Sequence, residues 1–83
     1  MYKVTVVVRK VSDNRAMSKS KFEESVEKAK ALISDTALEI SKLFDATGEV
    51  EVGVIVEENG RCFDSDSAFA IISNDKKSIT YEY

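Results

Sequence analysis

Few residues of this sequence could carry chemistry, and histidine is not among them. Histidine is the commonest general base, the commonest zinc ligand and the usual activator of serine and cysteine nucleophiles. Cys62 is the only cysteine. The positive charge of the neighbouring Arg61 could activate its thiol by lowering the thiol pKa, but the sequence has no histidine and no second cysteine to act with it. We therefore expect Cys62 to be a small apolar residue near a strand end, and the protein not to be an enzyme.

Two acidic segments could hold a cation. Asp64-Ser65-Asp66-Ser67 places oxygen ligands at alternate positions, as the start of a calcium loop does, but neither a turning glycine nor a closing glutamate follows. We expect a solvated bulge or strand end there, with no metal and no cofactor.

The second acidic segment is the run Glu49, Glu51, Glu57 and Glu58. Alternation spreads these carboxylates along the outer face of one strand, where cross-strand pairing with Lys3 or Arg9 would account for them. We expect a salt-bridged or solvated face.

Nucleic acid is not an expected partner. The chain has a net charge of -3 and contains neither a GxGxxG nor a GxxxxGK[ST] motif. Five basic residues fall between residues 9 and 21, but no stacking aromatics or glycine-rich turn accompany them, so they indicate a solvated loop.

The elements that must position these residues follow from periodicity. Residues 2–9 alternate, with Tyr2, Val4, Val6 and Val8 on one face and Lys3, Thr5, Val7 and Arg9 on the other, which predicts a strand. Residues 49–57 alternate in the same way, with Val50, Val52, Val54 and Val56 on the covered face and Glu51, Gly53, Ile55 and Glu57 on the other.

A single long helix is predicted between these strands. Ser20 and Glu23 have the spacing of a capping box, and apolar residues then recur every three or four positions to Phe44. About 25 helical residues would span roughly 37 Å. A helix of this length must cover the sheet diagonally or extend beyond it. Leu38 falls on the side of this helix opposite the apolar stripe.

The remaining chain predicts two further strands. Asn59-Gly60 suits a two-residue hairpin loop, because both positions there need positive φ. A third strand runs through residues 69–72, beginning near Cys62, and a fourth covers residues 78–83. The 83 residues thus predict a single α+β domain (1–83) of order β-α-β-β-β, with one long amphipathic helix packed on one face of a four-stranded, mostly antiparallel sheet.

Location is predicted from the lone cysteine, which fits a reducing compartment, and from the absence of a signal peptide or an apolar run of roughly 18 residues. We expect a cytoplasmic protein without membrane association.

Three segments resemble the trypsin-co-occurring domain, type 1: Phe22-Glu23-Glu24, the helix ending in Leu43-Phe44, and Glu49-Val50-Glu51-Val52-Gly53-Val54. Those small bacterial domains end in a strand with an aromatic near its end, here Tyr81 or Tyr83. The resemblance implies a non-enzymatic adaptor beside trypsin-like peptidases in bacterial conflict systems, and it transfers no catalytic residue.

The function predicted is a protein-interaction module whose partner is another protein or a second copy, as in a homodimer. The candidate binding residues are those of the uncovered sheet face and of the helix overhang: Lys3, Thr5, Val7, Glu51, Ile55, Glu57 and Leu38. The alternative is a small acidic inhibitor, encoded by a virus or mobile element, that binds a host nucleic-acid-processing protein.

Overall fold

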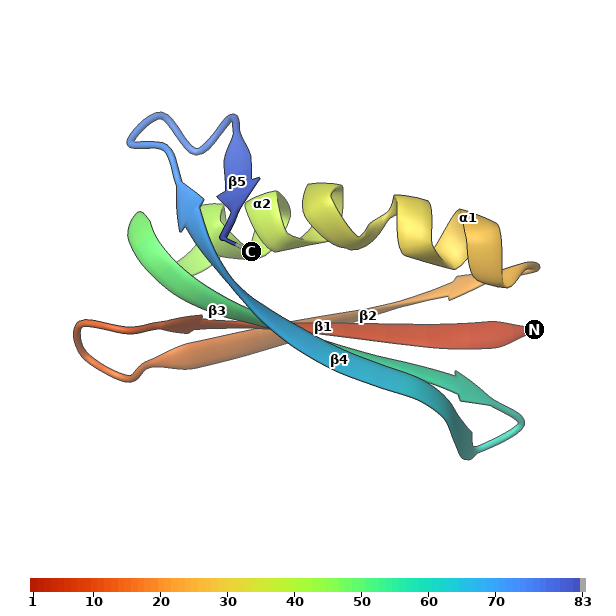
Figure 1. Cartoon of the computed structure of the whole chain (residues 1–83). Helices are drawn as coiled ribbons and strands as arrows, with labels where there is room; N and C mark the ends of the chain where they lie inside the picture. The colour runs from red at the N-terminus through yellow and green to blue at the C-terminus, as the bar shows by residue number, and fades with distance from the viewer. Residues whose placement is uncertain (83) are drawn as a thin grey trace.

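The computed structural model describes residues 1–82, which form five strands and two helices (Figure 1). In chain order the elements are β1 (Tyr2–Lys10), β2 (Ala16–Glu23), α1 (Val26–Ala31), α2 (Ile33–Phe44), β3 (Gly48–Glu58), β4 (Arg61–Ile72) and β5 (Ile79–Tyr81).

All five strands form one antiparallel sheet in the order β2-β1-β3-β4-β5, and both helices lie on the same side of it (Figure 1). The predicted fold, one long helix on a four-stranded sheet in the order β-α-β-β-β, is therefore wrong. The chain instead forms a hairpin, then two short helices, then three further strands.

The largest correction concerns residues 16–23, which form the edge strand β2 and not a loop followed by a helix. Ser20 does not cap a helix; it lies opposite Thr5 across the β1–β2 ladder, and the two hydroxyls are hydrogen-bonded at 2.9 Å. The actual N-cap is Ser25, whose Oγ accepts a hydrogen bond from the backbone N–H of Lys28 at 3.2 Å. Phe22, expected at the start of the apolar stripe, is 63% exposed on the sheet.

A break at Leu32 divides the remaining helical segment into six residues of α1 and twelve of α2. The Leu32 N–H donates to the carbonyl of Ala29 at 3.2 Å, a tighter turn than that of an α-helix. The predicted end of the helix is confirmed, since Asp45 adopts a left-handed C-cap with φ 55°.

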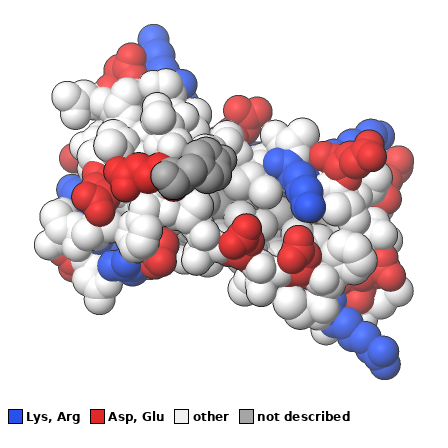
Figure 2. Space-filling model, in the orientation of Figure 1, with Lys and Arg blue, Asp and Glu red and all other residues white. Residues whose placement is uncertain are grey.

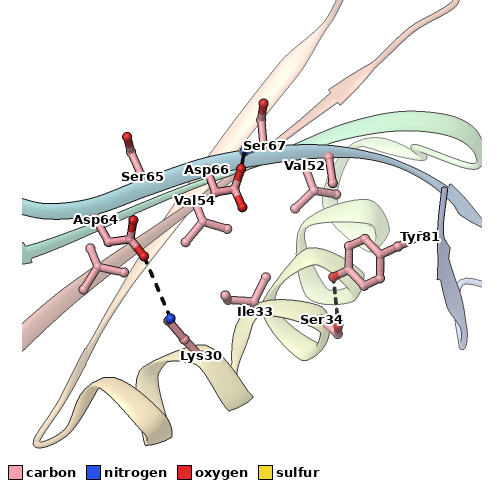
Figure 3. A pocket seen from close by; sticks show the side chains of 12 residues that line it. Lys30, Ile33, Ser34, Val52, Val54, Asp64, Ser65, Asp66, Ser67 and Tyr81 are labelled. Carbon is pink, nitrogen blue, oxygen red and sulfur yellow. Dashed lines mark hydrogen bonds and ion pairs between the residues drawn. The ribbon is translucent and has the colours of Figure 1, made fainter. Parts of the chain in front are cut away.

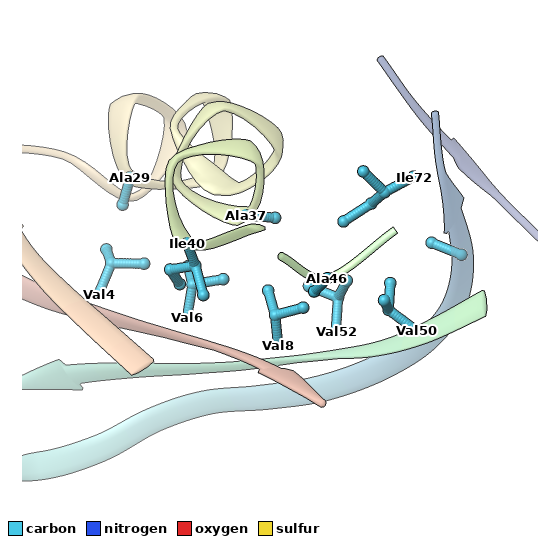
Figure 4. Packing of buried hydrophobic residues seen from close by; sticks show 11 residues of the cluster. Val4, Val6, Val8, Ala29, Ala37, Ile40, Ala46, Val50, Val52 and Ile72 are labelled. Carbon is cyan, nitrogen blue, oxygen red and sulfur yellow. The ribbon is translucent and has the colours of Figure 1, made fainter. Parts of the chain in front are cut away.

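The core lies between the helices and the centre of the sheet, as Figure 4 shows. Valines at alternate positions of β1 and β3 face Ala29, Ala37 and Ile40 of the helices. These three helix residues are fully buried. The alternation predicted for β1 and β3 is confirmed here, because their other positions, including Lys3 and Ile55, are not buried.

The predicted hairpin loop is also confirmed: Asn59 and Gly60 have φ values of 51° and 80°. Beyond it, the register of β3 and β4 shifts between Val56 and Glu57. Phe63 at this bulge makes an edge-to-face contact with Tyr2, with ring centroids 5.7 Å apart. The fourth predicted strand is observed only at Ile79–Tyr81, and Tyr83 lies outside the described residues.

Candidate interaction surfaces

The side of the sheet away from the helices is referred to below as the open face. It carries every second residue of the four long strands: Lys3, Thr5, Val7 and Arg9 of β1; Ala16, Ser18, Ser20 and Phe22 of β2; Glu49, Glu51, Gly53, Ile55 and Glu57 of β3; and Ser65, Ser67, Phe69 and Ile71 of β4. Six of the seven predicted binding residues lie on it together.

Charges on the open face are arranged as cross-strand pairs. Arg9 binds Glu51 with its Nη2 3.0 Å from Oε1, and its Nε donates to the same oxygen at 3.1 Å. At the other end of the same two strands, Lys3 and Glu57 are direct partners in the ladder. The predicted pairing of the acidic strand with β1 is thus confirmed for Glu51, while Glu49 lies opposite the apolar Ile71 and leaves one negative charge in excess on this face.

The centre of the open face lies on a twisted sheet, in which β4 crosses β1 and β2 obliquely (Figure 1), and several of its side chains are small. Val7 lies directly opposite Gly53, and Thr5 lies opposite Ile55, which is 40% exposed. A shallow depression of about 400 Å³ lies over Gly53, where no side chain fills the space between its neighbours.

Large apolar side chains occupy two opposite corners of this face. Phe22 lies at the β2 corner, and Phe69 and Ile71 lie towards the far end of β4 with 43% and 48% of their surfaces exposed. Sequence reasoning missed all three. The alternation of Phe69 and Ile71 with the buried Ala70 and Ile72 was the signal that could have assigned them to this face.

Leu38, the seventh predicted residue, is not part of the open face. It is half-buried and packs against the hydrophobic core, and the Ser41 hydroxyl donates to its carbonyl at 2.7 Å. The most exposed large apolar residue of the helices is Leu43, at 62%.

On the helix side, a groove of about 370 Å³ separates the helices from the first half of β4. Its floor is apolar and includes Val52 and Val54. Asp64 and Asp66 project into it from β4, whereas Ser65 and Ser67 point to the opposite side of the strand, as Figure 3 shows.

The rim of the groove is tied together by two polar contacts (Figure 3). Lys30 of α1 reaches across to Asp64, with Nζ 3.9 Å from Oδ2, and the hydroxyls of Ser34 and Tyr81 are hydrogen-bonded at 2.8 Å. Lys30 thus contacts one of the two carboxylates of β4, and the backbone N–H of Ser67 donates to the other, Asp66, at 2.8 Å.

The outer edge of β4 beside this groove is free over Arg61–Ala68, because within residues 1–82 the neighbouring β5 pairs only with Ala70, Ile71 and Ile72 and Glu82 donates to the carbonyl of Phe69. We call this segment the free edge of β4; Arg61, Asp64 and Asp66 lie on its helix side.

The opposite edge of the sheet is β2, and its helix side carries Lys19 and Lys21. Both lysines bind the same carboxylate, Glu39 of α2, at 2.8 and 2.9 Å. Their hydrogen bonds lower the pKa of Glu39 from its ordinary 4.5 to about 2. Glu23 lies on the same side of β2, opposite Tyr2, so the two lysines are balanced there by Glu39 and Glu23.

Candidate catalytic and metal-binding residues remain dispersed in the part of the chain that the structure describes. Cys62 is exposed, and its thiol donates only to the carbonyl of Asp64 at 3.7 Å. No group of three or more acidic or cysteine side chains within residues 1–82 is arranged to hold a metal ion. Figure 2 shows acidic and basic side chains interspersed on the visible face.

Comparisons with protein-family models, with curated proteins and with solved structures returned no match. The resemblance to the trypsin-co-occurring domain therefore stays a prediction. Neither of the two helices within residues 1–82 has the length and apolar character needed to span a bilayer.

Proposed function

We propose that this chain is a non-enzymatic protein-interaction module that pairs with a second copy of itself through the open face. The observation that carries this proposal is the distribution of exposed apolar side chains. Of the eight large apolar residues exposed within residues 1–82, Phe22, Ile55, Phe69 and Ile71 lie on this one face of the sheet.

Electrostatics favour a second copy as the occupant. The whole chain has a net charge of -3, so two copies repel each other at most orientations. On the open face Arg9 is paired with Glu51 and Lys3 faces Glu57, so only Glu49, opposite Ile71, adds a net charge, and two such faces repel each other less than the whole chains do. The side chains at the centre of the face, which belong to serines, Thr5 and Gly53, are short, so another sheet can pack closely there.

The size of the face predicts a weak dimer. Four strands about 4.8 Å apart, each paired over about eight residues at about 3.4 Å, present roughly 500 Å² per copy. Two copies would bury roughly 1,000 Å², the lower limit for a specific interface. Association is therefore expected only at high protein concentration.

The acidic-inhibitor alternative is less favoured. Glu49, Glu51 and Glu57 share the open face, but Glu51 is bound to Arg9 and Glu57 lies opposite Lys3, so Glu49 alone adds a net negative charge to this face. The adaptor role in bacterial conflict systems and the cytoplasmic location stay proposals, the latter supported by the exposed free thiol of Cys62.

Sedimentation velocity over a concentration series tests the proposal. Ile55→Lys places a charge at the centre of the open face and should weaken association about tenfold or more. Leu43→Lys is the matched control, because it adds the same charge at an exposed apolar site on the outside of α2 and should leave association unchanged. Equal behaviour of the two variants, or a wild-type protein that stays monomeric throughout, would contradict the proposal.

A further inference from the structure

The free edge of β4 carries one positive and one negative charge that form no ion pair within residues 1–82. Arg61 lies at the start of this edge, and Asp66 lies near its other end, where it accepts the backbone N–H of Ser67. The charge between them, Asp64, is bound to Lys30. An edge with one positive and one negative end is complementary to a second copy of itself that runs in the opposite direction.

Both of these charges lie on the helix side of the sheet, although they are five residues apart. In a regular strand, residues five apart point to opposite sides. The register of β3 and β4 shifts within this segment, so Arg61 lies opposite Glu58 and Asp66 lies opposite Val54, two residues of β3 that share the helix side. The bulge therefore brings the two charges to the same side of the edge.

We propose that a second copy of this chain pairs its β4 with β4 of the first copy, antiparallel and about a two-fold axis, so that the two sheets join into one. Residues 61–66 of each copy form the contact. Arg61 of each copy lies opposite Asp66 of the other, so that two ion pairs form. This contact is separate from the open-face pairing proposed above, because it uses the strand edge.

The same register satisfies the positions between the two charges. Cys62 lies opposite Ser65 of the second copy, and both side chains are on the open face. Phe63 lies opposite Asp64 of the second copy, and both are on the helix side, since Phe63 contacts Tyr2 there. The Phe63 side chains, each 56% exposed in a single copy, then lie beside each other at the two-fold axis and are removed from water.

Other registers of the two strands are less favourable. Placing Asp64 opposite Asp66 of the second copy sets aspartates against each other at two positions. Moving either strand by a single residue sets side chains of the open face opposite side chains of the helix side. The charges and the bulge therefore select the same register.

The contact leaves the far end of the edge to β5. Glu82 donates to the carbonyl of Phe69, which lies three residues beyond the contact. The strand of the second copy begins at Arg61 opposite Asp66, and its Asn59 and Gly60 turn back towards its own β3. Six residues per copy make a small interface, so association is expected at high protein concentration, up to about 1 mM.

Reversing one charge at a time tests this inference. Arg61→Glu sets the new carboxylate opposite Asp66, and Asp66→Arg sets the new guanidinium opposite Arg61, in each case at two positions of the dimer. Both variants are made in an Ile55→Lys background, which removes the open-face contact, and circular dichroism checks their fold. Lys42→Glu and Glu27→Arg are the matched controls, because they make the same changes in net charge at exposed positions of the helices.

Sedimentation velocity measures each variant alone and the equimolar mixture of the two edge variants. We expect each edge variant alone to associate about tenfold or more weakly than the Ile55→Lys protein, because like charges then meet twice. The mixture should restore association, since each variant then meets opposite charges at both ends of the other, and added salt should weaken it. Both controls should associate as the Ile55→Lys protein does.

Four results would each overturn the inference. They are an Ile55→Lys protein that stays monomeric up to about 1 mM, an edge variant that associates as strongly as this protein, a control that is weakened as much as an edge variant, and a mixture that associates no better than its components. None of these results depends on the open face, because every comparison is made among Ile55→Lys proteins.

Discussion

Replacing Ser25 with alanine tests where the helical segment begins, and thus whether β2 exists as a strand. Ser25 Oγ accepts from the Lys28 N–H at 3.2 Å, and α1 is only six residues long with Ala29 as its one buried residue. So short a helix is marginal without its cap. The loss of the cap should lower the free energy of unfolding by about 1 kcal/mol, within a range of roughly 0.5–2 kcal/mol.

The matched control is Ser20→Ala, which removes only an exposed hydrogen bond to Thr5. This change should lie within about 0.5 kcal/mol of wild type. Urea unfolding followed by circular dichroism measures both, and the Ser25→Ala protein should melt about 4–8 °C lower.

A helix that begins after Ser25 and a helix that begins at Ser20 predict opposite rankings of the stability losses in Ser25→Ala and Ser20→Ala. If the helix began at Ser20, Ser25 would be an interior helical residue and its replacement by alanine would stabilise the protein by a few tenths of a kcal/mol. Ser20→Ala would then carry the cost of the lost cap. A larger loss for Ser20→Ala than for Ser25→Ala would refute the assignment of residues 16–23 as β2.

Three further predictions concern ionisation, packing and backbone geometry. The pKa of Glu39 is lowered from 4.5 to about 2, so its ion pairs stabilise the fold above the unfolded-state pKa and are lost as the pH falls towards the folded-state pKa. The melting temperature should therefore fall from pH 5 to about pH 2. In the Glu39→Gln protein it should fall less steeply. If both proteins lose stability in parallel, the assignment fails. Ile40→Ala should cost about 2–5 kcal/mol because Ile40 is fully buried, whereas Ile71→Ala, at a site 48% exposed, should change urea stability by less than about 1 kcal/mol; equal losses would contradict the core. Gly60→Ala should cost about 1–2 kcal/mol because Gly60 has a φ of 80°. Gly53→Ala should be tolerated, since a Cβ there would meet only Val7 Cβ at 3.9 Å; the reverse order in thermal melts would count against the hairpin.

Sequence patterns predicted the strands whose two faces have different environments. In β1 and β3, buried valines alternate with half-buried or exposed residues, so period two is visible in the sequence. The loop at Asn59-Gly60 was equally predictable, because few other residues adopt positive φ at two successive positions. These elements place most of the predicted binding residues on one face.

Sequence patterns failed for β2 because an edge strand with Ser18 and Ser20 on one side and Lys19 and Lys21 on the other has no apolar periodicity. A serine and a glutamate three residues apart then suggested a capping box that does not form. The break at Leu32 was also invisible, since no glycine or proline lies near it. The apolar stripe predicted for the helix is confirmed at Ala29, Ala37 and Ile40, whereas Leu38, expected on the outer side, packs against the core.

The free edge of β4 was missed for a different reason. Asp64 and Asp66 were recognised as alternating carboxylates, but whether they lie on a free edge depends on where β5 ends beside β4. That end is set by tertiary packing, including the hydrogen bond between Tyr81 and Ser34. No local pattern in residues 61–68 records it.

The most direct test of the central claim is an NMR experiment on a mixture of isotope-labelled and unlabelled copies at high concentration, recording only contacts between different copies. The open-face dimer predicts intermolecular contacts to the methyl groups of Ile55 and Val7, and none to Leu43. Intermolecular contacts confined to Leu43 and the outside of the helices, or no contact at Ile55 in a sample that sedimentation shows to be associated, would contradict it.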